Sequence, residues 1–237
     1  MYSDAKVLKA TWLDIARRNQ WALIDNVDAW ISSVQAHYPE IGTDIQPSTL
    51  LLRAYSARLY QGCMYREERA AWEVWIYCYR AALRQSDSRE NVEDVVQETI
   101  ALVIEKLSQV RHPESFLPWV LTILRSVSRT FLQARRKGNV PLGAIEVTSE
   151  RLIDPMQQPA EETEQKILKE RMLSLLGQLK ASEREILIRQ LLFDERIGDI
   201  ARDLGLDAAY VRVMKHRALH RLRSMLGAEL GLENRSL

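Results

Sequence analysis

The residues most able to do chemistry in this chain form a strip of acidic and amide side chains near its middle. Asp94, Gln97, Glu98, Ala101 and Glu105 recur three and four residues apart, and the strip holds no basic residue. Side chains at this spacing share one face of an α-helix. Carboxylate and amide oxygens on such a face accept hydrogen bonds, which are stronger when one partner is charged. The spacing therefore predicts one acidic, amide-bearing face on a helix.

Basic and aromatic side chains follow the acidic strip after a short break. The break covers residues 109–114 and contains His112-Pro113, and Trp119 stands just beyond it. Arg125 and Arg129 lie one helical turn apart further along the chain. One segment therefore offers acid and the next offers base and an aromatic ring, with a proline-containing loop between them.

Two amphipathic helices must position these side chains. The first is predicted from apolar residues that recur with helical spacing at Val92, Val95, Val96, Ile100, Val103, Ile104 and Leu107. The second begins after Ser115, which can cap it, and Pro118 is tolerated in its first turn because that position needs no helical N–H. The inward face of the second helix carries Val120, Ile123, Leu124, Val127 and Phe131.

A second candidate site lies near the carboxyl end, where the pattern is helix, turn and capped helix. A capping box at Ser182-Glu183-Arg184-Glu185 predicts a helix to residue 192. Residues 196–204 predict a short helix, and Gly205 suits its left-handed end. Asp207 then caps a long helix from residue 208 to about residue 225. This order is typical of a helix-turn-helix, whose second helix enters the major groove of DNA.

The predicted recognition helix has an inward apolar face and an outward face of small, basic and histidine side chains. The outward residues are Ala208, Ala209, Arg212, Val213, His216, Arg217 and His220, and the inward ones are Val211, Ala218 and Leu222. Arginine can make bidentate contacts to guanine edges or to phosphate. His216 and His220 are also spaced to share a metal, but no third ligand is near in sequence. We therefore interpret both histidines as facing DNA.

Composition excludes several classes of protein. The chain has 237 residues, 46% hydrophobic and 27% charged, with a formal net charge of +1, so DNA binding requires local segregation of charge. The sequence contains no phosphate-binding loop, dinucleotide turn or nucleophile elbow, and we expect no cofactor, no metal and no enzymatic activity. Cys63 and Cys78 are the two cysteines. With no signal peptide and no membrane span, they indicate a protein of the reducing cytoplasm.

The amino-terminal segment is rich in tryptophan. Residues 2–38 predict two helices, and the second carries a stripe that runs from Trp21 and Leu23 to Val34. Two interpretations stay open: the tryptophans bury against the next domain, or the segment is a partner-binding or regulatory appendage. Helices over residues 48–63 and 67–83 follow, and the aromatic residues of the latter are predicted to pack in the core.

Residues 93–137 resemble region 2 of the sigma-70 family, most closely the extracytoplasmic-function (ECF) type. The resemblance rests on Asp94-Val95-Val96-Gln97-Glu98-Thr99, on Phe116-x-x-Trp119-Val120-x-x-Ile123 and on the basic end near Arg136. The later segment IGDIARDLGLDAAYVRVMKHRALHRLR resembles the helix-turn-helix of sigma region 4. The chain departs from the family pattern at Ser126, Met214 and Lys215.

The resemblance implies an all-α fold of two small helical domains joined by an extended linker, plus amino-terminal helices. We predict a helical extension at residues 1–45, a region 2-like domain at 46–137, a linker at 138–165, a region 4-like helix-turn-helix domain at 166–228 and a tail at 229–237. The linker is rich in proline and acid and lacks periodicity. It is either an inert tether or, as the family implies, an acidic segment that threads the polymerase cleft.

The resemblance also implies which residues act. Core polymerase binding falls to Asp94, Gln97, Glu98 and Ala101. The downstream promoter element and its melting fall to Arg111, His112, Phe116, Trp119, Arg125, Ser126 and Arg129. The upstream promoter element falls to Ala209, Arg212, Val213, His216, Arg217 and His220.

The function implied is that of a promoter-specificity factor that promotes strand opening. Its partners would be core RNA polymerase, through the clamp helices and flap of the large subunit, promoter DNA, and an anti-sigma protein or other regulator. One alternative is a helix-turn-helix regulator that binds DNA without polymerase, which leaves the acidic strip unexplained. Another is an adaptor that only holds a partner protein, which leaves the helix-turn-helix unexplained.

Overall fold

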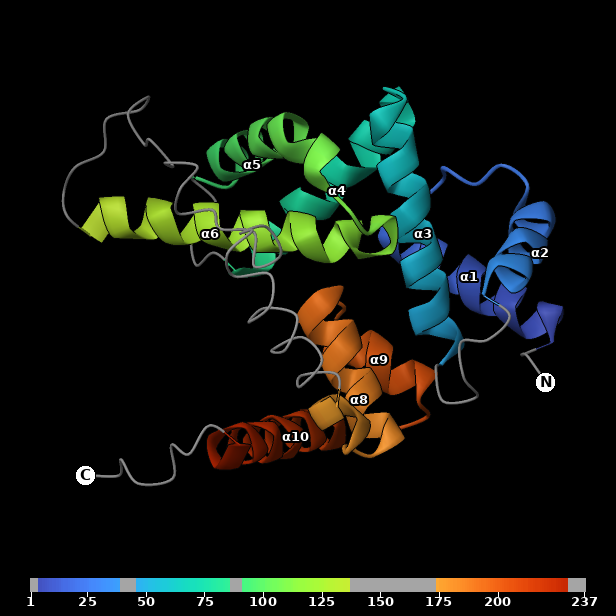
Figure 1. Ribbon diagram of the computed structural model, residues 1–237, viewed down its shortest axis with the longest axis vertical. Helices are drawn as coiled ribbons and strands as arrows, with labels where there is room; N and C mark the ends of the chain where they lie inside the picture. Colours follow the sequence, from blue (N-terminus) through green and yellow to red (C-terminus); the bar gives the residue numbers. More distant parts are fainter. Residues whose placement is uncertain (1–3, 39–45, 86–90, 137–173, 230–237) are drawn as a thin grey trace. The chain divides into compact units, whose positions relative to one another are not determined.

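The computed structural model describes residues 4–38, 46–85, 91–136 and 174–229. These residues form helices joined by short connections, and no strand occurs among them, which confirms the all-α prediction (Figure 1). The chain divides after residue 148 into two compact units, and each unit is described by itself. The predicted linker at residues 138–165 lies outside the described residues, as does the tail beyond residue 229.

Unit 1 is a bundle in which four helices pack on one another and two more pack at its amino-terminal side. Its described elements are α1 (Ala5–Asn19), α2 (Val27–His37), α3 (Pro47–Met64), α4 (Glu68–Gln85), α5 (Val92–Lys106), the 3₁₀ helices η1 (Leu107–Gln109) and η2 (Pro113–Ser115), and α6 (Phe116–Arg136). Helices α4 and α6 contact each other and both α3 and α5, and α1 contacts α2 and α3.

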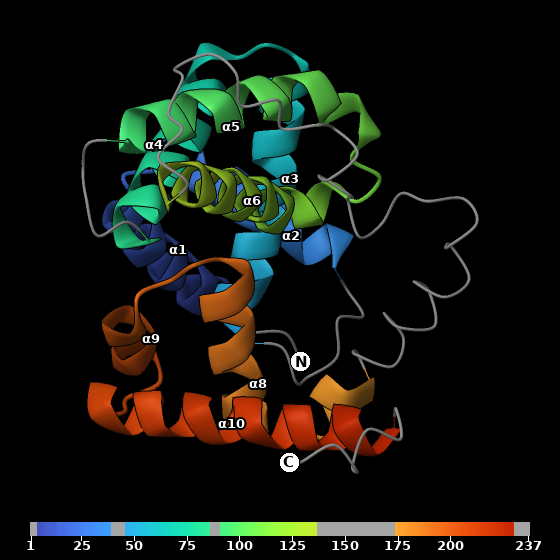
Figure 2. The same cartoon turned by 90° about the vertical axis from the view of Figure 1, so that its left-hand side faces the viewer.

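The core of unit 1 forms around α6, because one face of this helix is wholly apolar. Leu117, Val120, Leu121, Leu124 and Val127 are each at most 1% exposed. The helix contacts α3, α4 and α5 at once, and Figure 2 shows it nearly end-on with α5 above it. Full burial of such a side chain contributes ~1.5–3 kcal/mol, so this face fixes the place of α6 in the bundle.

An aromatic cluster joins the amino-terminal segment to α3. The Trp12 ring lies 6.2 Å from Trp21, 4.5 Å from Trp30 and 4.6 Å from Tyr55, measured between ring centroids. Trp12, Trp21 and Tyr55 are buried and Trp30 is half-buried. Of the two interpretations of this segment, the structure therefore favours the one in which its tryptophans bury against the next helices.

The predicted helical stripe beginning at Trp21 is wrong in its first part. Gln20 ends α1 with a left-handed φ of 57°, and its N–H bonds back to the Ala16 and Arg17 carbonyls. Trp21 and Leu23 consequently lie in the connection between α1 and α2. They are buried there because the chain changes direction against the bundle, not because they share a helical face.

The aromatic residues of α4 lie on two faces, and only one faces the core. Tyr77 is buried beside Val74, as predicted. Trp72 is 58% exposed and stacks on Trp75 with centroids 5.3 Å apart, and Trp75 stacks on Tyr79 at 5.1 Å. The core-packing prediction is therefore wrong for Trp72, because these three stacked rings recur at helical spacing on the side opposite the buried face.

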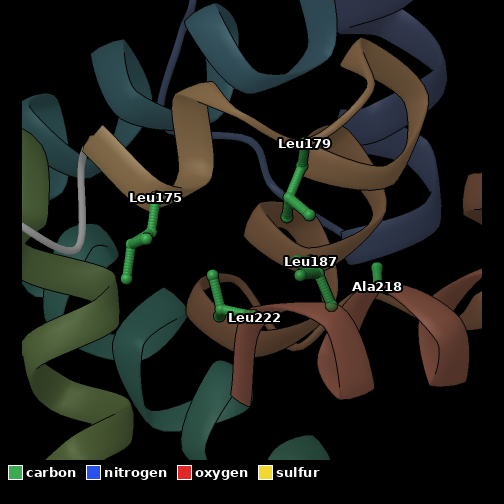
Figure 3. Packing of buried hydrophobic residues seen from close by; sticks show 5 residues of the cluster. All are labelled: Leu175, Leu179, Leu187, Ala218 and Leu222. Atoms are coloured by element: carbon green, nitrogen blue, oxygen red, sulfur yellow. The ribbon is translucent and has the colours of Figure 1, made fainter. Parts of the chain in front are cut away.

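Unit 2 has the predicted order of helix, turn and long helix. Its described elements are α8 (Ala181–Leu187), the π-helical turn η3 (Ile188–Leu192), α9 (Ile197–Asp203) and α10 (Ala208–Glu229). One apolar cluster, shown in Figure 3, consists of Leu175, Leu179, Leu187, Ala218 and Leu222. A second consists of Ile186, Ile200, Ala201 and Val211. Together these clusters hold α9 and α10 against α8.

The start of α8 differs from the predicted capping box. The helix is capped at Lys180, whose N–H donates to the Glu183 carboxylate at 3.3 Å. The predicted box at residues 182–185 is therefore two residues too late. Glu185, expected to close the box, is instead buried and lies 3.9 Å from Arg189.

Arg189 forms a buried ionic centre in unit 2. Its side chain is 0% exposed and its guanidinium bonds to the Glu195 carboxylate at 2.6 Å and to the Asp203 carboxylate at 2.5 Å. Burial lowers the pKa of Arg189, but hydrogen bonds and charge from Glu195 and Asp203 raise it by more. Arg189 thereby ties η3 to the turn that follows it and to the end of α9.

Candidate functional site

The acidic strip lies on the solvent face of α5. Asp94, Gln97 and Ala101 are exposed and Glu98 is half-buried. The apolar residues of the same helix that face the core include Val96, which is 0% exposed. The shared outward face predicted from spacing is therefore present, and its oxygens can accept hydrogen bonds from a cationic partner.

Ile104 extends the strip with an apolar side chain. The sequence pattern predicts an inward position for it, which is wrong, because Ile104 is 70% exposed. Thr99 belongs to the buried face. Its hydroxyl donates to the Val95 carbonyl at 2.7 Å, so this donor has a hydrogen-bond partner without water. The surface that follows Ala101 is consequently mixed, with an aliphatic group beside the acids.

The connection between α5 and α6 exposes polar side chains. Arg111 and His112 are both exposed, and His112 Nδ1 lies 3.5 Å from the Glu114 carboxylate. Burial, and then the negative charge of Glu114, raise the pKa of Tyr38, the residue that follows α2. Side chains of this kind on a loop can contact nucleic-acid phosphates and bases.

The two aromatic residues at the start of α6 have different positions. Phe116 is 0% exposed, so its ring belongs to the core of unit 1, and its contact with the promoter stays a prediction. Trp119 is half-buried and keeps part of its ring accessible. Phe116 packs between Tyr60 of α3 and Trp119, with ring centroids 5.8 Å and 6.0 Å away. Trp119 is therefore the aromatic side chain here that can meet a ligand.

Three further candidate residues follow Trp119 along α6. Arg125 and Ser126 are half-buried, and Arg129 is exposed. Ser126 lies two helical turns after Trp119 and therefore on the same face. The accessible part of α6 thus combines an aromatic ring, a hydroxyl and guanidinium groups, the chemistry used to hold single-stranded nucleic acid.

The cap of α6 comes from a residue that sequence reasoning did not find. The Leu117 N–H donates to the hydroxyl of Ser56 on α3 at 2.9 Å, and the predicted cap, Ser115, belongs to η2. Ser56 carries no local signal for this role, because it lies far from α6 in the sequence. Only the packing of α3 on α6 reveals it.

The helix predicted to recognise DNA, α10, begins where the sequence pattern predicts. Gly205 has a left-handed φ of 64°, and the Asp207 carboxylate accepts from the Ala209 N–H at 2.7 Å and from the Tyr210 N–H at 3.2 Å. The exposed side chains of the predicted DNA face are Ala209, Arg212, Val213, His216, Arg217 and His220. Ala208 was also expected outward but packs against the second apolar cluster, because it follows the cap directly.

A shallow groove runs along one side of α10. It has a volume of ≈ 370 Å³ and is lined by Ile197, Arg212, Lys215, His216, Leu219, His220 and Arg223. Cationic and imidazole groups dominate this lining. Lys215 is half-buried at its edge, and Met214 packs against the second apolar cluster, so these two departures from the family pattern do not disturb the exposed face.

Other chemistry is not favoured in the described part of the chain. No group of three or more histidine, cysteine or acidic side chains among these residues could hold a metal ion. Burial raises the pKa of the Cys63 thiol to about 11 and that of Cys78 to about 12, so neither is a reactive thiolate at neutral pH. Within the same residues no helix is long and apolar enough to cross a membrane.

Comparisons with known proteins agree with this geometry. Residues 73–138 match the family model for sigma-70 region 2. The chain is 31% identical over 134 residues to the probable RNA polymerase sigma factor RfaY of Xanthomonas campestris pv. campestris. That alignment covers 56% of this chain and 34% of the relative, so the chain spans about a third of the length of the curated relative it matches.

A solved structure gives a more distant comparison. The sigma factor RpoE, crystallised in complex with the anti-sigma factor NepR from Bartonella quintana, is 18% identical to this chain. The alignment covers 67% of this chain and 95% of that one, with a TM-score of 0.30.

The helical fold of unit 1 and the family match together define a sigma-type region 2 domain, which includes α5, the connection after it and α6. The predicted resemblance of residues 93–137 to region 2 of the sigma-70 family is thereby confirmed. The match begins within α4, so α1, α2 and α3 lie outside it.

Proposed function

We propose that this chain is a promoter-specificity sigma factor of the ECF type, which binds core RNA polymerase and promotes strand opening. The observation that carries the proposal is the arrangement within the region 2 domain. An outward acid-and-amide strip on α5 is followed by an exposed polar loop and by an accessible tryptophan on α6. These are a protein-docking face and a nucleic-acid face on consecutive elements.

The α5 strip is the proposed docking face for the clamp helices of the polymerase large subunit. Asp94, Gln97 and Glu98 would accept hydrogen bonds from cationic side chains of the partner, and Ala101 would allow close approach. Ile104 adds apolar contact at the end of this face. Such a mixed surface, with an apolar group beside charged acceptors, suits a protein partner better than DNA, which would be repelled by the carboxylates.

The loop and α6 are the proposed site for the melted downstream element. Trp119 would stack on an unpaired base, and Arg125 and Arg129 would contact the strand that leaves the duplex. Arg111 and His112 would contact the backbone from the loop. Phe116 packs against the Trp119 ring from the core side and makes no contact with DNA in this proposal.

The upstream element is assigned to the exposed face of α10. Arg212, His216 and Arg217 would reach base edges or phosphates in the major groove, and Ala209 and Val213 would allow the helix to lie deep. Unit 2 would therefore bind the upstream element, and the flap of the polymerase would hold that unit. The protein itself would act in the cytoplasm without catalysing a reaction, since bond formation belongs to the polymerase.

Transcription reconstituted from purified components tests the proposal. Core polymerase, this protein and genomic fragments should give discrete run-off products, and sequencing of their 5′ ends should reveal a shared pair of promoter elements. Core polymerase alone is the control. The proposal fails if the protein neither co-purifies with core polymerase nor changes its start sites, and a shift of DNA by the protein alone would then indicate a regulator that acts without polymerase.

A further inference from the structure

Ser56 of α3 caps a helix that begins far away in the sequence. Its side chain is 0% exposed, and its hydroxyl accepts a hydrogen bond from the Leu117 N–H at 2.9 Å. The same hydroxyl donates to the Pro113 carbonyl at 3.4 Å. One buried hydroxyl therefore bonds both to η2 and to the first turn of α6.

The first N–H groups of any helix lack partners within the helix, and a nearby side chain usually satisfies one of them. In α6 that side chain comes from another helix, so the bond also fixes where α6 begins relative to α3. Since Trp119 lies in the same first turn as Leu117, displacement of this turn moves the indole directly.

A second contact from α3 reinforces the first. Tyr60 lies one helical turn after Ser56 and packs edge-on against Phe116, with ring centroids 5.8 Å apart. Phe116 in turn lies 6.0 Å from Trp119. A polar contact and an aromatic contact from one face of α3 thus determine the direction in which Trp119 presents its ring.

We propose that Ser56 is a positioning residue for promoter opening, which holds the η2 loop and Trp119 in the geometry that receives an unpaired base. This inference rests on the proposed function. Ser56 lies outside residues 73–138, which match the region 2 family model, so α3 supplies this support from outside the matched segment. Ser56 touches no DNA in this proposal and acts only through Leu117 and Pro113.

The test uses the full chain with Ser56→Ala and Ser56→Cys. Cysteine fills nearly the same volume as serine but accepts hydrogen bonds poorly, so it removes the cap with little change in packing. Ser48→Ala is the matched control, because Ser48 is a second buried serine of the same helix. Amide hydrogen exchange at Leu117 is the first measurement, and amides of α4 report whether the rest of unit 1 stays folded.

The second measurement is promoter opening by the complex with core polymerase, followed by permanganate reactivity of unpaired thymines. Loss of one buried hydrogen bond should accelerate Leu117 exchange and slow opening by a factor on the order of ten in both Ser56 variants. Footprints over the upstream element should stay unchanged, and a premelted bubble template should restore transcription. Ser48→Ala removes a buried hydroxyl from the start of the same helix and should leave Leu117 exchange and promoter opening at wild-type levels.

Two results would overturn the positioning role. One is unchanged Leu117 exchange in Ser56→Cys, which would show that the hydroxyl is not the cap. The other is faster exchange with normal opening, which would show that the cap does not matter for the promoter. Wild-type protein that opens no promoter would instead overturn the proposed function and this role with it, while the exchange data would still report the cap.

Discussion

The hydroxyl of Tyr55 donates a hydrogen bond to the carboxylate of Glu73 in the interior of unit 1. The other carboxylate oxygen of Glu73 accepts from the Ala22 N–H at 2.6 Å, and Glu73 is only 2% exposed. Burial, and then the negative charge of Glu73, raise the pKa of the Tyr55 phenol. One buried carboxylate thus joins α3, α4 and the connection after α1.

Removal of this carboxylate should destabilise unit 1. Glu73→Ala leaves the Tyr55 hydroxyl and the Ala22 N–H buried without their partner, and we expect a loss of about 3 kcal/mol in the free energy of unfolding. Urea unfolding followed by circular dichroism measures it. Glu68→Ala, on the exposed side of the same helix, is the control and should change stability by less than about 0.5 kcal/mol. Equal effects of the two substitutions would contradict the assigned role of Glu73.

Deletion of the amino-terminal segment should destabilise the fold of unit 1. A chain that starts at Gln46 loses Trp12 and Trp21 from the aromatic cluster and leaves Tyr55 and Glu73 uncovered. Each large aromatic side chain that loses its burial costs ~3–5 kcal/mol, so the melting temperature should fall by more than 10 °C for a domain of this size. Thermal circular dichroism of the two chains compares them. A shortened chain as stable as the full one would show that the segment is a separate appendage.

The α5 strip should carry polymerase docking. Changing Gln97 to Ala together with Glu98 to Arg removes two acceptors and should weaken binding of core polymerase at least tenfold, since charge-assisted hydrogen bonds are worth ~1.5–3 kcal/mol each. Affinity is measured by fluorescence anisotropy of labelled protein. Glu68→Arg is the control, because Glu68 is an exposed acid of a different helix, α4. The docking face is misassigned if both variants bind equally well.

The two DNA faces should fail in different steps. Arg217→Ala should weaken the upstream contact by ~1–3 kcal/mol if the guanidinium is bidentate to guanine, and footprinting of the upstream element measures this loss. Trp119→Ala should spare the upstream footprint and impair opening, because stacking on an aromatic ring is worth ~1–3 kcal/mol per base. Permanganate reactivity of unpaired thymines measures opening.

A premelted bubble template separates these two defects. It should rescue the Trp119 variant and leave the Arg217 variant deficient. If both variants lose upstream protection equally and the bubble rescues neither, Trp119 acts only as a core residue and the downstream half of the mechanism is wrong.

The ionic centre of unit 2 should be essential for the helix-turn-helix. Arg189→Ala leaves Glu185, Glu195 and Asp203 without their shared cation, and removal of one partner of a buried ion pair costs ~3–5 kcal/mol. Upstream footprints should be lost with the fold of unit 2, as monitored by exchange of α9 amides. Arg202→Ala removes an exposed guanidinium of α9 and should leave exchange unchanged. Normal α9 protection in the Arg189 variant would refute this account.

Local patterns determined the helices that carry the candidate sites. The apolar seam of α5, the capped start of α10 and the left-handed Gly205 all depend on residues within a few positions of one another. The structure has them as predicted, except that Ile104 of the seam is exposed. Spacing alone also placed Asp94, Gln97 and Ala101 on one exposed face. Such features are recoverable from sequence because helical periodicity and capping act over a single turn.

Tertiary packing decided which of the singled-out residues are accessible and what supports them. Periodicity could not tell that Phe116 is buried or that Ile104 and Trp72 are exposed, because each lies on a helix whose neighbours were unknown. The cap of α6 by Ser56 and the Tyr55–Glu73 bond join residues far apart in the sequence. Hydrogen bonds of this kind leave no local pattern, since they exist only once the helices that bear the donor and the acceptor have packed together.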